Sequence, residues 1–186
     1  QRHARAPIHT SDKENMSLVG QLRGKVYYSN AIVAEAGSTT IYVEVKDFPM
    51  GVAQFTLFDK RGIQRAERLS FVNKGKQLKI DIETDKEKYQ PREKVKMTLR
   101  VSDERGIPMP ADLSLAVVDD QLLTFADDKS ANMLSSLMLE YDIKEKVEEP
   151  AFYFDPEEEK ADKALDHLLL TAGWRRFTWV QVLHNE

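Results

Sequence analysis

The chain has 186 residues, of which 41% are hydrophobic and 31% are charged, a composition typical of globular domains. Its formal net charge of −4 at pH 7 argues against a protein whose main task is to neutralise nucleic-acid phosphates. The absence of cysteine excludes disulfides, thiolate metal sites, a cysteine nucleophile and an internal thioester. Because the apolar runs are short, we expect no direct membrane insertion. Because the chain begins with Gln1, we expect either a cut piece of a longer chain or a mature form.

Residues 1–17 are polar and show no periodic pattern, with Arg2, His3 and Arg5 preceding Pro7. Such a segment buries too little apolar surface to be ordered by itself. We therefore expect a flexible lead or linker over 1–17.

Residues 18–118 alternate apolar and polar side chains with a period of two, as expected for strands of a half-buried antiparallel sheet. The clearest rows are Ile41/Val43/Val45, Leu69/Phe71, Leu78/Ile80/Ile82, Val95/Met97/Leu99/Val101 and Leu113/Leu115/Val117. Turn residues separate them, for example Lys60-Arg61-Gly62 and Asp103-Glu104-Arg105-Gly106. Short alternating rows that follow one another along the chain with turns between them are typical of β-sandwich modules of the immunoglobulin or fibronectin kind.

A boundary between two modules is expected at 73–77, giving a partial β-sandwich module over 18–75 and a second module over 76–186. About four strands precede the boundary and about three follow it, whereas a complete sandwich needs about seven. Either upstream sequence is missing or the two halves share one core.

The pattern changes to a helical period after residue 118. Ser130 is the expected N-cap of a helix over 130–141, whose apolar stripe is Leu134, Leu137, Met138 and Tyr141. Asp155 and Pro156 mark the start of a second helix over 156–172, with a stripe of Ala161, Leu165, Leu168, Leu169 and Ala172. The predicted fold class is mainly β: sandwich modules with a two-helix insertion at about 130–172, whose stripes pack against a sheet face or bridge the modules.

The acidic and histidine residues offer few candidate sites. The run from Glu145 to Asp166 lacks the central glycine of a calcium loop and is typical of a solvated helix start. The pairs Asp119-Asp120 and Asp127-Asp128 could do acid/base chemistry across a cleft, but such pairs also cap turns. The histidines at 3, 9, 167 and 184 lack zinc-like spacing. We assign no catalytic, cofactor-binding or metal-binding residue and expect a protein that is not an enzyme.

The segment Trp174-Arg175-Arg176-Phe177-Thr178-Trp179-Val180 is typical of a short aromatic strand. Trp174, Arg175, Arg176 and Trp179 are candidate partner-binding residues, because aromatic and basic side chains together can stack on bases or glycans. Alternatively, the two tryptophans pack into a sheet while both arginines pair with the acidic helix start.

Two segments carry a resemblance to a known family. Tyr89-Gln90-Pro91-Arg92-Glu93-Lys94-Val95, followed by Asp103 to Pro108, resembles the opening of a macroglobulin-type β-sandwich domain, and Ala111 to Asp119 is similar to a later strand in alpha-2-macroglobulin-like proteins. Arg92 stands where this family usually has glycine. We therefore expect the turn there to be closer to type I, which needs no positive φ.

A second resemblance depends on the order of several motifs. Tyr153-Phe154-Asp155-Pro156 and Leu168 to Phe177 resemble envelope proteins of Bacteroides-type bacteria, in which such modules precede the plug domain of a TonB-dependent receptor. The resemblance implies a periplasmic or outer-membrane-associated fragment, with structural motifs but no catalytic residue.

Three functions remain open from the sequence. The first is a non-catalytic structural or interaction module of a larger cell-envelope protein, whose partners are other domains of the parent chain or an envelope protein, without nucleic acid or cofactor. The second is a glycan- or peptide-binding module that uses a sheet edge or exposed aromatics: Tyr27, Tyr28, Tyr153, Trp174 and Trp179. The third is a hydrolase that pairs Asp119 with Asp128 or Glu149.

Overall fold

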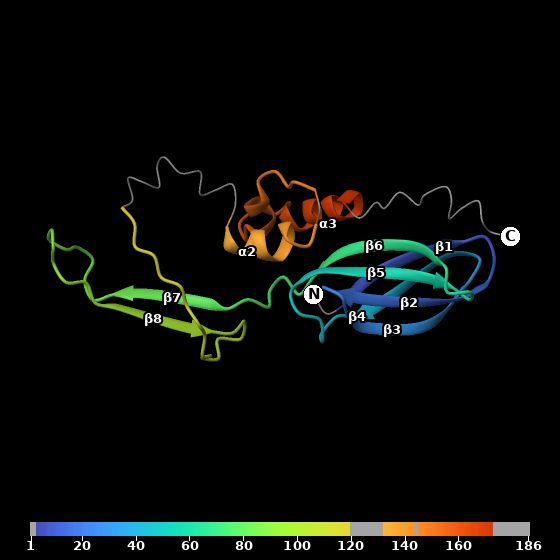
Figure 1. The fold of residues 1–186 in the computed structure, drawn as a ribbon, viewed down its shortest axis with the longest axis horizontal. Helices are drawn as coiled ribbons and strands as arrows, with labels where there is room; N and C mark the ends of the chain where they lie inside the picture. Colours follow the sequence, from blue (N-terminus) through green and yellow to red (C-terminus); the bar gives the residue numbers. More distant parts are fainter. Residues whose placement is uncertain (1–2, 120–131, 144, 173–186) are drawn as a thin grey trace.

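The computed structural model describes residues 3–119, 132–143 and 145–172, and these form a mainly β protein (Figure 1). The strands are β1 (His3–Thr10), β2 (Glu14–Leu22), β3 (Lys25–Ala34), β4 (Gly37–Glu44), β5 (Gly51–Asp59), β6 (Gln64–Val72), β7 (Lys79–Thr84) and β8 (Met97–Ser102). The helical segments are α2 (Met133–Ser135), the π-helical η1 (Ser136–Glu140), the 3-10 turn η2 (Pro150–Phe154) and α3 (Ala161–Ala172).

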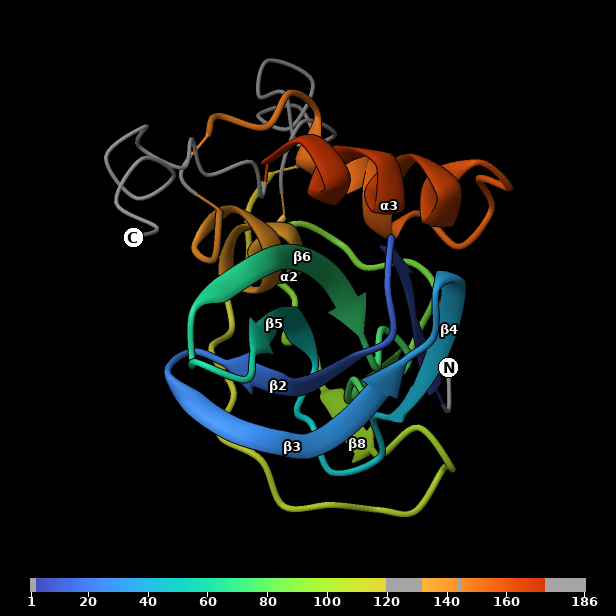
Figure 2. The same ribbon diagram turned by 90° about the vertical axis from the view of Figure 1, so that its right-hand side faces the viewer.

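Strands β1 to β6 form a sandwich of two sheets. One sheet has the order β3-β2-β5-β6, the other pairs β1 with β4, and all pairings are antiparallel. Their inner faces meet in a core that includes Leu18, Val43, Phe48 and Phe55. Gly20 lies where β2 passes these rings, and a Cβ built on it would come within 2.9 Å of Phe55. Figure 2 shows the two sheets nearly end-on.

The N-terminal segment is an integral part of this sandwich, so the expected flexible lead over 1–17 is wrong for the residues described. Strand β1 pairs with β4 in a register that sets Ala4 opposite Val43 and Ile8 opposite Thr39. The alternation in β1 is Ala4, Ala6 and Ile8, and two of these side chains are too small to stand out against their polar neighbours. The module before residue 73 therefore has six strands rather than about four.

Strand β5 is buried on both faces, and a third layer explains why. Ala53, Phe55 and Leu57 point into the sandwich core, whereas Val52 belongs to a second cluster on the opposite side of the sheet. That second cluster combines Val52 and Phe71 with five buried residues of the C-terminal segment: Leu139, Ile143, Val147, Leu165 and Leu169. The helical segments thus cover the outer face of β5 and β6 (Figures 1 and 2). The expectation that an apolar stripe packs against a sheet face is confirmed for the second helix, whose Leu165 and Leu169 belong to this cluster.

The first helix differs from its prediction in both start and face. Asn132, rather than Ser130, is the N-cap of α2, through a capping box with Ser135; Ser130 lies outside the described residues. The helix then widens into η1, where the Tyr141 N–H donates to the Ser136 carbonyl. This i→i+5 turn rotates the following residues. Leu139 is consequently buried, while Tyr141 is 79% exposed.

The second helix is confirmed in its apolar stripe but begins later than predicted. Ala161, Leu165 and Leu169 are buried, and Leu168 and Ala172 pack beside them. The carboxylate of Asp155 accepts the Glu157 N–H, as a cap would, but this closes only a turn, and α3 begins at Ala161.

Beyond the sandwich, β7 and β8 form an antiparallel hairpin that extends away from it (Figure 1). The strand predicted around Leu113, Leu115 and Val117 is not formed: residues 110–118 are described without strand pairing. Only the start of this stretch joins β8, through the Met109 N–H to the Val101 carbonyl and a bridge between Ser102 and Pro108.

Candidate interaction surfaces

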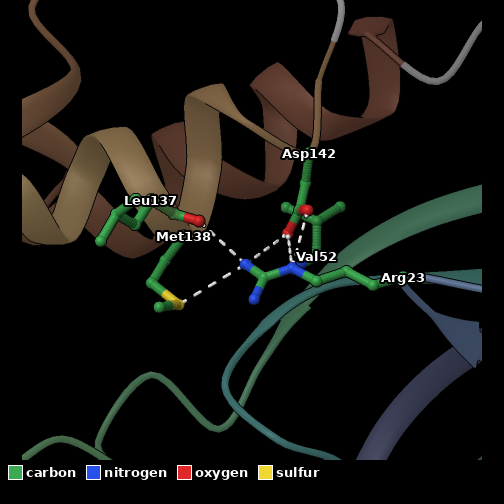
Figure 3. Close-up of polar contacts among 5 residues, drawn as sticks. All are labelled: Arg23, Val52, Leu137, Met138 and Asp142. Atoms are coloured by element: carbon green, nitrogen blue, oxygen red, sulfur yellow. Dashed lines mark hydrogen bonds and ion pairs between the residues drawn. The ribbon is translucent and has the colours of Figure 1, made fainter.

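The helical layer is attached to the sandwich by one arginine in the β2–β3 turn (Figure 3). Arg23 has a φ of 48°, and its guanidinium donates to the Asp142 carboxylate from Nε at 2.9 Å and from Nη2 at 3.1 Å. Nη2 also donates to the Leu137 carbonyl at 2.8 Å. The hydrogen bond to Asp142 raises the pKa of Arg23 above its ordinary value. One side chain thus binds both the first turn of η1 and the turn that follows η1.

Helix α3 is attached to β6 by two further ion pairs. Asp162 contacts Lys74, just beyond the end of β6, and Asp166 contacts Arg68 in the middle of that strand. As α3 proceeds, its partners therefore move backwards along β6, so the helix and strand run in opposite directions. Asp162 and Asp166, which form these two ion pairs, both belong to the acidic run from Glu145 to Asp166.

The β7–β8 hairpin has one apolar face and one charged face. The register sets Ile80 opposite Val101 and Ile82 opposite Leu99, so these four side chains share a face. Ile80 is 50% exposed and Ile82 is 59% exposed. On the other face Arg100 pairs with Glu83.

Exposed apolar side chains continue along the chain beyond the hairpin. They are Ile107, Met109, Leu113, Leu115, Val117 and Val118. An isolated two-stranded hairpin is marginal in water, and so many exposed apolar side chains in one region are typical of an interaction site. We call the face formed by Ile80, Ile82, Leu99 and Val101 the hairpin face.

Two turns of the chain have the same sequence pattern and the same hydrogen bonds. In Asp59-Lys60-Arg61-Gly62-Ile63 the aspartate carboxylate accepts the N–H of residues 61 and 63, at 2.8 and 2.9 Å. In Asp103-Glu104-Arg105-Gly106-Ile107 the equivalent bonds are 2.9 and 2.8 Å. The sequence predicts both segments as turns, but the pattern that they share was not recognised from the sequence. Because the first turn joins β5 to β6, the second indicates that β8 and residues 107–118 correspond to such a strand pair.

The loop that carries the macroglobulin resemblance corrects one expectation. Arg92 has a φ of 67° behind Pro91, and the Glu93 N–H donates to the Gln90 carbonyl at 3.0 Å. A positive φ at the third position is the type II pattern, so the type I prediction is wrong. Lys86 pairs with the Glu93 carboxylate, and this contact, together with the Gln90 N–H, lowers the pKa of Glu93. The ion pair ties the two ends of the loop together, which favours the turn despite the arginine.

The remaining acidic candidates are dispersed in the structure. Glu149 is exposed at a φ of 47°, and Asp128 lies outside the described residues, as do Asp120 and Asp127, so the predicted pairs with Asp119 stay predictions. Among the described residues, the carboxyl groups with a shifted pKa are all lowered, by hydrogen bonds that hold turns: Asp59, Asp85 and Glu93. A general acid needs the opposite shift.

Of the histidines, 3, 9 and 167 are exposed and 184 lies outside the described residues. Within the described ranges, no three histidine or acidic side chains are grouped to hold a metal ion.

The aromatic candidates divide between two clusters and the undescribed end of the chain. Tyr27 and Tyr28 are half-buried against the sandwich core, with Tyr27 5.0 Å from the Phe48 ring, while Tyr153 packs in the helical cluster. The predicted partner-binding residues Trp174, Arg175, Arg176 and Trp179 lie outside the described residues.

No family model, curated protein or solved structure matches the chain. Within the described part of the chain, none of the helices has the length and hydrophobicity of a membrane-spanning helix.

Proposed function

We propose that this chain is a non-catalytic interaction module of a larger cell-envelope protein. The hairpin face carries the proposal: Ile80 and Ile82 are half-exposed, on a sheet whose opposite face is charged. An amphipathic sheet of this kind is half of a sandwich, because its apolar side needs a second layer. The occupant we propose is the apolar face of another sheet, in a further domain of the parent chain.

The repeated Asp-x-x-Gly-Ile turn supports this assignment. It brings Pro108 and Met109 alongside β8, where the Met109 N–H donates to the Val101 carbonyl at 3.1 Å, in the way that β6 lies alongside β5. A docked layer would complete a three-stranded sheet from an existing hairpin. The cell-envelope setting is supported by the resemblance of the Tyr89 to Val95 and Leu168 to Phe177 motifs.

Site-specific photo-crosslinking in cells that make the protein tests the docking face. A photoreactive amino acid at Ile80 or Ile82 should give a discrete adduct with one envelope component or within the parent chain. The matched control is Asp81, whose side chain lies on the charged face of the same strand. Adducts from both faces alike, or none from Ile80 and Ile82, would contradict the docking proposal.

Cell fractionation of the same adducts tests the setting. We expect the crosslinked species in the envelope fraction. An adduct that forms from Ile80 but fractionates with the cytosol would leave docking standing and overturn the envelope assignment.

A further inference from the structure

The segment that follows β8 begins to pair with this strand and then leaves it. The Met109 N–H donates to the Val101 carbonyl at 3.1 Å. Beside this bond, Ser102 and Pro108 form an antiparallel bridge. Residues 110–118 are described without strand pairing, and each of them is exposed. The start of a third strand is therefore present, and it already defines a register on β8.

Continued beyond Met109, this register brings the apolar residues of the segment onto the hairpin face. In an antiparallel pair, each step forward on one strand is a step back on the other, so Ala111 would lie opposite Leu99. In the same way, Leu113 would lie opposite Met97. Leu99 belongs to the hairpin face, and Met97, two residues before it in β8, shares that face. The apolar surface would then extend over three strands.

The prolines of the segment fit the edge position that this register gives them. Because Met109 donates to β8, the backbone nitrogens of its neighbours Pro108 and Pro110 face away from β8. Proline has no N–H and is tolerated in edge strands where that position faces solvent. Pairing with β8 therefore loses no hydrogen bond at either proline, and Pro110 discourages the addition of a fourth strand.

The charged face of the hairpin gains a neighbour of the right sign in the same register. Asp112 would lie opposite Thr98, one pair away from Arg100. Diagonal neighbours on one face of a sheet are within reach of a long side chain. Arg100 already pairs with Glu83 on β7, and Asp112 would approach it from the other side.

The uncovered hairpin face explains why residues 110–118 do not pair in this structure. Ordering an extended segment costs conformational entropy, which hydrogen bonds exchanged with water barely offset. Leu113 is 43% exposed and gains burial only when a second layer covers its face. We propose that residues 109–113 pair with β8 as a third strand when the apolar sheet of the partner docks. The inference rests on the proposed docking, and it makes the docking surface three strands wide, with a segment that orders on binding.

Two cysteine pairs test this register, because the chain has no cysteine of its own. Thr98→Cys with Asp112→Cys joins a pair without hydrogen bonds, whose Cα atoms would lie about 4.5 Å apart, within the range of a disulfide. The control combines Thr98→Cys with Ala111→Cys, one residue away, whose side chain would point to the opposite face. Both double variants replace exposed residues only.

Both variants are oxidised in cells that make the protein and as the purified chain, and mass spectrometry quantifies the linked peptides. In cells we expect about tenfold more of the 98–112 link than of the 98–111 link, because side chains that point apart cannot be bridged. In the purified chain, where the segment is unpaired, the two links should form in similar amounts.

The outcomes separate this inference from docking itself when the same variants carry the photoreactive residue at Ile80. Equal amounts of the two links in cells that also give the Ile80 adduct would overturn the third strand and leave docking standing. An equally large preference for the 98–112 link in the purified chain would show a strand that forms without a partner, and would overturn its coupling to docking. Equal links without an Ile80 adduct would contradict both proposals.

Discussion

Asp59 organises the turn between β5 and β6 with both oxygens of its carboxylate. One oxygen accepts the backbone N–H groups of Arg61 and Ile63, and the other accepts the guanidinium of Arg65 at 2.5 Å. The Ile63 N–H has the largest effect on the pKa of Asp59, which is lowered, with Arg65 and Arg61 acting in the same direction against desolvation. The ionised form is therefore the one that the fold stabilises.

A pH dependence of stability follows from Asp59. Because its folded pKa is below the unfolded value of about 4, its contribution is complete above that pH and is lost as the pH falls through the folded pKa. We expect Asp59→Asn to lower the melting temperature at pH 7. The difference in melting temperature between variant and wild type should become smaller below about pH 4. Thermal melts followed by circular dichroism measure this. Asp47→Asn, at an exposed aspartate, is the control. If the difference in melting temperature between Asp59→Asn and wild type stayed constant with pH, the attribution of this pH dependence to Asp59 would be contradicted.

Arg92 shows what a residue pattern can and cannot predict. The sequence predicts the turn at Pro91 correctly, because proline fixes φ at the second position. It predicts the wrong turn type, because arginine disfavours a positive φ and the compensating Lys86–Glu93 pair is not visible in a spacing rule. Four non-glycine residues among those described have positive φ: Arg23, Asn73, Arg92 and Glu149.

At the scale of elements, predictions succeed where one face of an element is buried and the period is regular. Helix α3 has its predicted stripe, and β7 and β8 have their alternation. Strand β5 was not among the predicted alternating rows, because burial on both faces removes the polar half of the pattern. The π-helical turn in η1 moves the buried face to Leu139, which no 3.6-residue period predicts.

A substitution in α3 tests the contact between the helical layer and the sheet. Leu169 is 1% exposed beside Val52 and Phe71, so Leu169→Asp should destabilise the protein by about 3–5 kcal/mol, through a buried unpaired charge. Chemical denaturation followed by circular dichroism measures the loss. Leu137→Asp, at a side chain 51% exposed, should change stability by less than about 1 kcal/mol. Equal losses from both variants would mean that the helical layer is not held by this face.

At the scale of the whole molecule, the main surprise is where the helical segments pack. Sequence reasoning grouped them with the second module, but their contacts lead back to β5, β6 and the turn at Arg23. Arg23 and Asp142 are 119 residues apart, and no local pattern relates them. The apolar stripe of a helix predicts that the helix packs against another element. Only the structure identifies that element as the side of the sheet formed by β5 and β6. The candidate surface could be predicted in part. The alternation of β7 and β8 is visible in the sequence, but the sequence does not show that residues 113–117 fail to pair as a third strand.

The contrast between the packed sandwich and the exposed β7–β8 hairpin predicts uneven protection from amide hydrogen exchange. β2 and β5 lie between neighbours on both edges, β2 packs into the sandwich core and β5 contributes to both packed clusters, whereas all six residues of β7 are exposed. We expect amides of β7 and β8 to exchange at least tenfold faster than those of β2 and β5, because fewer contacts oppose local opening. Mass spectrometry of exchange at peptide resolution measures this. Comparable protection in both regions would show that the hairpin face is already covered in solution.

The twin Asp-x-x-Gly-Ile turns have a consequence for how the chain finds its pairing. One turn joins β5 to β6 inside the sandwich, and the other joins β8 to the exposed segment at Pro108 and Met109, yet their hydrogen bonds agree within 0.1 Å. Their shape is therefore set by five consecutive residues and not by their surroundings. Each can form before any distant contact exists and fix the alignment of its two strands, so the chain carries two independent starting points for ordering its sheets.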